Sequence, residues 1–206
     1  VTLLMATPFF VSVHPSVPAK SVKDYIALAK TRPGELTYAS SGAGSSQHLN
    51  GVVLQQMAGI KITHVPYRSG APAIADLIGG HVMSMFATIP SVAPHIRSGR
   101  LRALGIASAR RSPALPDVPA VGETVKGYDM TTWYSLHAPP KTPREIVMRF
   151  NAAVNAALND PETRRRLTDD GAIVQPMTLE EVAAFFNKEY ERMGGIVRAS
   201  GVKADQ

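Results

Sequence analysis

The stretch from Thr37 to Leu49, TYASSGAGSSQHL, constrains the fold most, because a strand, a tight turn and a helix start follow one another within it. Leu36 to Ala39 has strand propensity, and the residues after it are small, polar or glycine. Ser45 is a good helix N-cap, and apolar residues recur behind it as far as about Ala58. The sequence therefore predicts a strand, a glycine-rich turn and a helix.

This turn is suited to an anion, and to a carboxylate in particular. The first N–H groups of a helix have no partner within the helix and carry partial positive charge. Gly42 and Gly44 let the main chain approach a ligand closely, and Ser41, Ser45 and Ser46 add hydroxyl donors. The alternative interpretation is an ordinary turn between a strand and a helix, which is common in proteins.

The stretch lacks the features of three better-known glycine-rich motifs. Gln47 stands where the dinucleotide fingerprint has its third glycine, and no acidic residue lies at the expected distance. No Gly-Lys-Ser/Thr follows, which excludes a P-loop. The stretch also does not match the Gly-x-Ser-x-Gly nucleophile elbow.

Composition narrows the possible functions further. The 206 residues carry a formal net charge of +6, but the basic residues are scattered and no nucleic-acid-binding module is visible, so we expect no nucleic-acid partner. The absence of cysteine excludes disulfides, thiolate zinc sites and cysteine nucleophiles. The six histidines show no metal-ligand spacing, so we predict neither a metal nor another cofactor. No apolar run approaches the length of a transmembrane helix.

Strands and helices continue to alternate after Ala58. We predict strands over residues 61–65, 82–86 and 101–106 and helices over residues 71–78 and 91–97. This alternation is typical of an α/β fold with a parallel sheet core. The loops at Ser40, Tyr67 and Ala87 each follow a strand and precede a helix, so they are expected at one rim of the sheet, where ligands bind in such folds.

The two ends of the chain read differently. Val1 to Val13 contains two strand segments with a break at Pro8, and residues 128–137 form another extended segment. We expect both to cross between two lobes. Helices are predicted over residues 143–158, with Ile146, Val147 and Phe150 on one apolar face, and over residues 159–168. A brief strand at 173–174 precedes a capping box at Thr178–Glu181 that begins the last helix. The chain starts in mid-element, so we expect missing sequence upstream.

Several long motifs in the chain resemble one family. These are HPSVPAKSVKDYIALAK, LTYASSGAGSSQHL, HVPYRSGAPAIADLIGGHV, GRLRALGIASARRSPALPDVPAVGE and YDMTTWYSLHAPPKTPREIVMRFNAAVNAAL, followed by LTDDGAIVQPMTLEEVAAFF. In this order they closely resemble the tripartite tricarboxylate transporter receptors, also called Bug-type solute receptors. The resemblance covers nearly every residue.

The resemblance implies a periplasmic solute-binding protein, not an enzyme, with a type II periplasmic-binding-protein-like α/β fold of two lobes. Such receptors close over a small organic anion, a mono- or dicarboxylate, in a cleft between the lobes and present it to membrane permease subunits. It also implies a complete second lobe and a partial first lobe. We expect residues 1–8 to be a crossing strand and remnant of the first lobe, 9–134 the second lobe, and 135–206 the C-terminal helical part of the first.

The resemblance and the turn chemistry together give a set of candidate ligand-binding residues. They are Ser40, Ser41, Gly42, Ala43, Gly44, Ser45, Ser46, His48, Tyr67, Arg68, Ser69, Gly70, Ala71, Ala87 and Thr88. His48 has packing as an equal alternative, Arg68 has an exposed loop position, and Trp133 is more readily a packing residue. Many members carry an acidic residue where this chain has Ala87, so a plain carboxylate is favoured over an amino acid.

Three other functions remain open on the sequence alone. A serine hydrolase would use Ser45 or Ser46 with His48, but no acidic partner is evident. The ligand-sensing half of a regulator would share the two-lobe design but needs a DNA-binding module. A binding-incompetent fragment would expose apolar surface at the partial first lobe and form a homodimer.

Overall fold

A computed structural model describes residues 1–112, 115–169 and 171–200, which divide into two compact units. Unit 1 contains Val1–Thr7 and Thr132–Gly195, and unit 2 contains Pro8–Thr131 and the residues from Ile196 onward. The chain thus passes from one unit to the other at Thr7–Pro8, at Thr131–Thr132 and, within the last helix, at Gly195–Ile196. The assignment of residues 1–8, 9–134 and 135–206 to lobes of a receptor stays a prediction.

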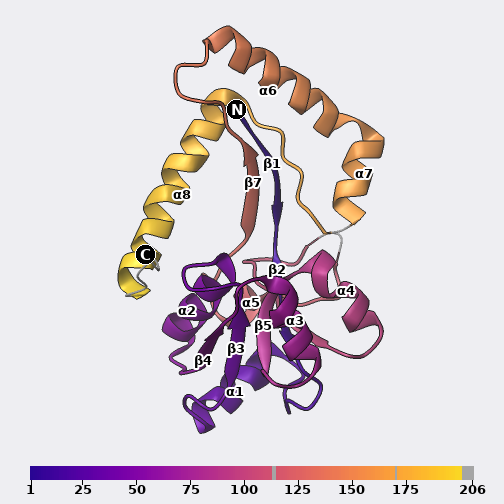
Figure 1. Ribbon diagram of the computed structural model, residues 1–206, viewed down its shortest axis with the longest axis vertical. Coiled ribbons are helices and arrows are strands. Elements are labelled where there is room, and N and C mark those ends of the chain that lie inside the picture. Colours follow the sequence, from indigo (N-terminus) through magenta and orange to yellow (C-terminus); the bar gives the residue numbers. More distant parts are fainter. Residues whose placement is uncertain (113–114, 170, 201–206) are drawn as a thin grey trace. The chain divides into compact units, whose positions relative to one another are not determined.

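Unit 2 is built on a five-stranded sheet in the order β4-β3-β5-β2-β6 (Figure 1). Its strands are β2 (Phe9–Val13), β3 (Thr37–Ser40), β4 (Thr63–Pro66), β5 (Ser84–Thr88) and β6 (Arg102–Ile106). β3 runs parallel to β4 and β5, whereas β2 lies antiparallel between β5 and β6. The predicted parallel core is therefore right for the four strands that alternate with helices, and β2, for which the sequence predicts no direction, joins them antiparallel.

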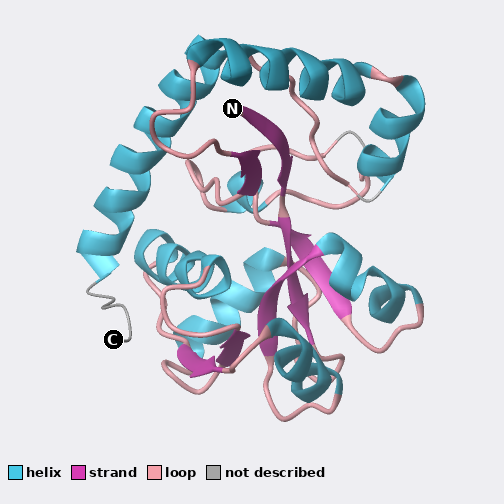
Figure 2. Cartoon of the chain, turned by 45° about the horizontal axis from the view of Figure 1, so that its top comes forward, coloured by secondary structure: helices cyan, strands magenta, loops and turns pink. Residues whose placement is uncertain are grey.

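Helices cover both faces of this sheet, as Figure 2 shows. They are α1 (Val22–Thr31), α2 (Ser46–Ala58), α3 (Gly70–Ile78), α4 (Ile89–Arg97) and the short α5 (Val121–Thr124). Successive side chains of a strand point to opposite faces. Ala39 accordingly joins the core beneath α3 and α4, with Leu77 and Val92. Tyr38, the preceding residue, faces α2 and makes ring contacts with His48 and Phe86.

The helix ends follow from local chemistry. Ser21 caps α1 by accepting a hydrogen bond from the N–H of Asp24 at 3.1 Å. Gly59 ends α2 in the left-handed conformation, at φ 61°, where a residue without Cβ is favoured. These ends confirm the helix predicted between Ser45 and Ala58.

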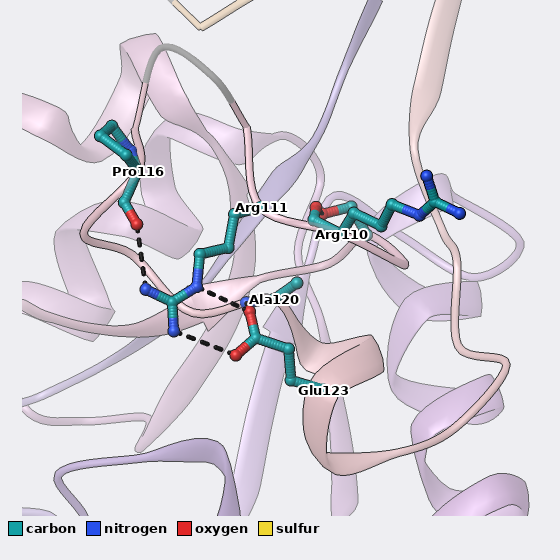
Figure 3. Close-up of polar contacts among 6 residues, drawn as sticks. Arg110, Arg111, Pro116, Ala120 and Glu123 are labelled. Atoms are coloured by element: carbon teal, nitrogen blue, oxygen red, sulfur yellow. Dashed lines mark hydrogen bonds and ion pairs between the residues drawn. The ribbon is translucent and has the colours of Figure 1, made fainter.

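Arg111, which follows β6, is hydrogen-bonded to Pro116 and to Glu123 of α5 (Figure 3). The Arg111 guanidinium donates to both carboxylate oxygens of Glu123, at 2.8 and 3.0 Å, and to the carbonyl of Pro116 at 3.0 Å. The hydrogen bonds from Arg111 are the main cause that lowers the pKa of Glu123 to about 2. Arg110 points away from this cluster in Figure 3, so these neighbouring arginines differ in role.

Unit 1 combines a two-stranded antiparallel sheet with three helices. They are β1 (Thr2–Thr7), β7 (Thr132–Leu136), α6 (Arg144–Asn159), α7 (Pro161–Asp169) and α8 (Leu179–Ser200), whose last residues belong to unit 2. Two amides of α6 fasten it to the chain beside it. The Asn151 amide donates to the carbonyls of Val1 and Met177, and Asn155 donates to Met177 and accepts from the Thr2 hydroxyl.

Three predictions for this part have clear outcomes. The capping box is confirmed, since Thr178 N–H donates to the Glu181 carboxylate and Glu181 N–H to the Thr178 hydroxyl. The brief strand at 173–174 is reduced to one antiparallel bridge between Ile173 and Ala6. The apolar face of α6 is not buried within the described residues, because Ile146 is 47% and Phe150 58% exposed.

Candidate functional site

Two of the three predicted loops meet at one edge of the unit 2 sheet. Because β3, β4 and β5 are parallel, their carboxyl ends at Ser40, Pro66 and Thr88 point the same way. The N–H of Tyr67 donates to the carbonyl of Ser40 at 3.0 Å, which joins the loop after β4 to the loop after β3. We call this the carboxyl edge, and it is where α/β sheets bind their ligands.

The third predicted loop is wrong in its placement. Ala87 and Thr88 lie inside β5, which begins and ends two residues later than predicted, and α4 begins at Ile89 instead of Ser91. Ala87 is fully buried in the core beneath α3 and α4. Its side chain has no surface to offer a ligand, so we leave it out of the proposed site. The Thr88 hydroxyl, half-buried, donates to the Ser91 hydroxyl at 3.0 Å.

The turn between β3 and α2 uses several of its own N–H groups. The N–H of Ser41 donates to the Gln47 side-chain oxygen at 2.7 Å, and that of Gly42 to the Ser40 hydroxyl at 3.1 Å. The N–H of Gly44 donates to Nδ1 of His48 at 3.0 Å. Gly42 and Gly44 have φ values of 122° and 75°, so this compact shape does need glycine. These three N–H groups shape the turn and are not free for an anion.

The donors that remain lie at the start of α2. The Ser45 hydroxyl caps the helix, since it accepts from the N–H of His48 at 3.3 Å and donates to the Gly42 carbonyl at 2.8 Å. Within the described residues, the N–H groups of Ala43, Ser46 and Gln47 have no protein partner. The hydroxyls of Ser41 and Ser46 likewise make no hydrogen bond to any described residue. These five groups are the ones that the turn and the start of α2 together offer to an anion.

The start of α3 offers a second set of donors. Ser69 is its N-cap in an extended conformation, but no side chain caps the helix. Gly70 and Ala71, its first two residues, therefore keep N–H groups that the helix itself does not use, and Pro72 has none to offer. Gly70 lies close to α2, since a Cβ built there would be 3.9 Å from the Gln47 side-chain nitrogen.

Tyr67 and Arg68 differ in what they offer. The Tyr67 hydroxyl donates to the Asp76 carboxylate at 2.7 Å, and burial together with Asp76 raises the pKa of Tyr67 to about 12. That hydroxyl is therefore committed to α3. Arg68 is exposed and makes no hydrogen bond or ion pair within the described part of the chain. Its guanidinium is the side-chain cation nearest in sequence to the α3 start and can pair with a carboxylate.

Acidic residues are distributed unevenly among the helix starts. The first turns of α1, α5, α6, α7 and α8 each contain an aspartate or glutamate. The first turns of α2, α3 and α4, which begin at the carboxyl edge, contain none. An acid in the first turn stabilises a helix but repels an anion from its N-terminus. The edge therefore keeps an uncompensated positive field.

Two histidines lie stacked behind the turn. The rings of His48 and His64 are 3.8 Å apart between centroids and 6° from parallel, with Tyr38 beside them. Nε2 of His64 lies 2.6 Å from the Ser40 hydroxyl. Burial lowers the pKa of His48, and burial together with His48 lowers the pKa of His64 to about 4. Both rings are therefore neutral near neutral pH.

The residues predicted from the sequence for this edge do not include Gln47 and His64, although both contribute to it. In the sequence Gln47 stands out only as the residue in place of the third glycine of the dinucleotide fingerprint, whereas in the structure its side-chain oxygen accepts from the N–H of Ser41. His64 lies in β4 directly beside Tyr38 in register, so both face α2. A strand position opposite Tyr38, on the face toward His48, is the signal that could have found it.

The arrangement does not assemble the serine hydrolase considered above. No hydrogen bond joins the His48 ring to the hydroxyl of Ser45 or Ser46, because Nδ1 of His48 accepts from Gly44. Ser40 and His64 do touch, but Ser40 is fully buried and no carboxylate orients His64 within the described residues. Trp133 lies in unit 1, where it packs against Phe185 and Phe186, as predicted.

A mixed α/β sheet whose carboxyl edge gathers acid-free helix N-termini is an architecture that favours an anionic ligand at that edge. Residues 1–202 match the family described as tripartite tricarboxylate transporter family receptor. The chain belongs to this family, whose members are periplasmic solute-binding receptors. No helix among the described residues combines the length and apolar character that crossing a membrane requires.

The relatives and solved structures agree with this assignment. The chain is 34% identical over 206 residues to protein BugT of Bordetella pertussis, covering 98% of this chain and 63% of BugT. Rpa4515 of R. palustris, solved with adipate, superimposes with a TM-score of 0.90 at 32% identity, covering 98% of this chain and 68% of that one. MatC of Rhodopseudomonas palustris, solved with malate, gives 0.82 at 31% identity, covering 96% and 68%. The chain spans 58% to 63% of the length of the first relatives that it matches.

Proposed function

We propose that this protein captures a small mono- or dicarboxylate at the carboxyl edge of unit 2 and delivers it to the membrane permease subunits of a tripartite transporter. It acts in the periplasm, as its family does, and it carries out no chemistry on the ligand. Because the chain spans about three fifths of the length of the first relatives that it matches, the activity of the whole receptor, with the first lobe closing over the ligand, is part of this proposal.

The observation that carries the proposal is the pair of helix starts at one edge. α2 and α3 begin in adjacent loops, joined by the hydrogen bond from Tyr67 to Ser40, and neither has an acidic residue in its first turn. Each helix N-terminus is equivalent to about half a positive charge. Two such termini side by side favour a carboxylate strongly over a neutral solute.

The donors divide into two groups that suit a carboxylate ligand. One set serves one carboxylate of the ligand and consists of the N–H groups of Ala43, Ser46 and Gln47 with the Ser41 and Ser46 hydroxyls. The other set consists of the N–H groups of Gly70 and Ala71 and serves a second carboxylate. Arg68 adds a mobile full charge for a second carboxylate. That Rpa4515 was solved with adipate and MatC with malate, both dicarboxylates, supports this ligand class.

Isothermal titration of the purified chain with adipate, malate and the neutral diamide of adipate tests the proposal. We expect saturable binding of at least one dicarboxylate and none of the diamide, because the site selects negative charge. Gly44→Asp should abolish binding or weaken it by more than about tenfold, since it adds a carboxylate beside the α2 start.

Gly59→Asp is the matched control. Gly44 and Gly59 both have positive φ, at 75° and 61°, and a Cβ on either meets nothing within 4 Å. The two substitutions thus cost similar backbone strain and add the same charge, but Gly59 lies at the far end of α2. Equal loss of affinity in both variants, or binding of the diamide as tight as that of adipate, would contradict the proposed site.

A further inference from the structure

The stacked histidines hold the turn Ser40–Gly44, which we call the anion turn, through two separate hydrogen bonds. Nδ1 of His48 accepts the N–H of Gly44 at 3.0 Å, while His64 contacts the Ser40 hydroxyl, which bonds both the N–H and the carbonyl of Gly42. His48 comes from α2 and His64 from β4. The two rings therefore connect both ends of the turn to the two elements beside it.

The bond from Gly44 defines where the proton of the neutral His48 ring is. An imidazole nitrogen that accepts an N–H must carry a lone pair, so Nδ1 of His48 is unprotonated and its proton is on Nε2. The Ser40 hydroxyl has a single hydrogen and two acceptors within reach, namely the Gly42 carbonyl at 3.0 Å and, when it is unprotonated, Nε2 of His64 at 2.6 Å. The turn thus needs one defined neutral tautomer of His48.

A proton added to either ring disturbs this arrangement. On His48 it would occupy Nδ1 and face the N–H of Gly44, which would lose its acceptor. On His64 it would place a positive charge 3.8 Å, between ring centroids, from His48. Two imidazolium rings at that separation repel each other, so the pair takes up protons reluctantly.

The groups that the described part of the chain packs around the two rings carry no charge that would compensate such a proton. β3 contributes Tyr38, whose hydroxyl donates to the carbonyl of His48 at 3.4 Å, and β5 contributes Phe86 against Tyr38. From α1, Tyr25 acts on Tyr38, and burial raises the pKa of both phenols, so both stay neutral. Within the described residues, neither histidine ring is bonded to an acidic side chain, a lysine or an arginine.

We propose that His48 and His64 are positioning residues of the ligand site, which hold the Ser40–Gly44 turn in its binding shape only while both imidazoles are neutral. Neither ring needs to touch the ligand. Acidification then releases Gly44 from His48, loosens the turn and weakens the capture of a carboxylate. The effect on the turn stands by itself, whereas the effect on the ligand rests on the proposed function.

Nuclear magnetic resonance of the ¹⁵N-labelled chain tests the effect on the turn without any ligand. At about pH 8 we expect His48 as the tautomer protonated on Nε2. On titration toward about pH 4, the amide resonance of Gly44 should move with the same midpoint as the His48 ring nitrogens. A Gly44 amide that does not follow His48, or a His48 ring protonated on Nδ1 near neutral pH, overturns the proposal.

Two variants of His48 separate positioning from packing. His48→Asn places an amide oxygen near the former Nδ1, so it can still accept from Gly44 but cannot titrate. His48→Gln places its oxygen one bond further out and loses this acceptor. We expect the Gly44 amide to be independent of pH in the asparagine variant and displaced at every pH in the glutamine variant. Identical behaviour of the two variants overturns the proposal.

Adipate binding measured on the same proteins gives the second readout. For the wild type we expect affinity about twofold to tenfold weaker at acid pH, the range that one net hydrogen bond accounts for. Protonation of adipate itself weakens its binding to every variant alike, so His48→Asn should lose less affinity than the wild type on acidification, and His48→Gln should bind weakly throughout. If adipate binds to none of them, the proposed function fails, while the Gly44 titration still decides whether the histidines position the turn. Where adipate binds, a wild-type affinity that falls on acidification no more than that of His48→Asn contradicts the proposal.

Discussion

Replacing Gly51 with alanine should destabilise unit 2, against the usual effect of this substitution in a helix. Gly51 lies within α2 directly above Tyr38. A Cβ at this position would be 2.5 Å from Cζ and 2.9 Å from Cδ2 of the Tyr38 ring, which is closer than real Cβ contacts allow. The ring cannot withdraw easily, because Tyr38 is fully buried among His48, His64 and Phe86.

Two opposing energies decide the sign. Alanine is better than glycine inside a helix by about 0.8–1 kcal/mol. Forcing an extra carbon into a filled core costs about 1–3 kcal/mol, and this clash involves a ring with no free space. The difference is a net loss of about 0–2 kcal/mol in the free energy of unfolding, and we expect the upper half of that range because the Tyr38 ring has no space to move into. The displaced ring should also disturb the histidine stack behind the anion turn.

Urea denaturation followed by circular dichroism measures this loss. Gly195→Ala in α8 is the matched control, since a Cβ at Gly195 meets nothing within 4 Å. This control should be stabilised by about 0.5–1 kcal/mol, and the single tryptophan, Trp133 in unit 1, reports on it by fluorescence. A Gly51→Ala protein as stable as the wild type would refute the close packing of Tyr38 against α2.

Three further changes have expected outcomes. Ser12→Ala should raise the melting temperature by the equivalent of about 1 kcal/mol, because the Ser12 hydroxyl is buried without a hydrogen-bond partner among the described residues. Arg111→Ala should raise the pKa of Glu123 from about 2 toward its ordinary value in a carboxyl titration, whereas Arg110→Ala should leave it unchanged. The lowered pKa of His64 means that the unfolded chain binds its proton first, so stability should fall as pH drops from about 6.5 to about 4. The full shift is equivalent to about 3 kcal/mol, which partial exposure of the ring reduces to about 1–2 kcal/mol, and His64→Gln should remove this part of the pH dependence in denaturation curves.

Local chemistry was readable from the sequence, and long-range pairing was not. The Ser45 cap, the Gly59 stop and the Thr178–Glu181 capping box depend on neighbours within one turn, so short motifs predict them. The direction of β2 depends on strands far along the chain, and no local pattern encodes it. The two-residue shift of β5 also escaped prediction, because Ala87 and Thr88 suit either a strand end or a loop.

The candidate site likewise has features that local sequence predicts and features that it does not. Helix starts at the carboxyl edge follow from the alternation of strands and helices. Which N–H groups stay free depends on side chains that fold back onto the turn, namely Gln47 and His48, and on His64 from the next strand. Sequence spacing alone does not predict these contacts, because they depend on how side chains from separate elements meet in space. The contribution of the individual ligand-binding residues stays a prediction until binding is measured.

The antiparallel strand β2 has a consequence for how the chain reaches its native state. Phe9–Val13 pairs with Ser84–Thr88 and with Arg102–Ile106, so this interior strand of the sheet comes first in the sequence and its two partners come last. Val13 pairs with Ser84, so the chain between them must close into a long loop before the two strands can pair. The entropy lost in closing that loop opposes folding until the hydrogen bonds between the strands form. A chain emerging from the ribosome therefore keeps β2, whose five residues are all buried in the native state, unpaired until most of unit 2 is made. During that interval an apolar strand is open to wrong partners, so mispairing of β2 is the misfolding route that this topology favours.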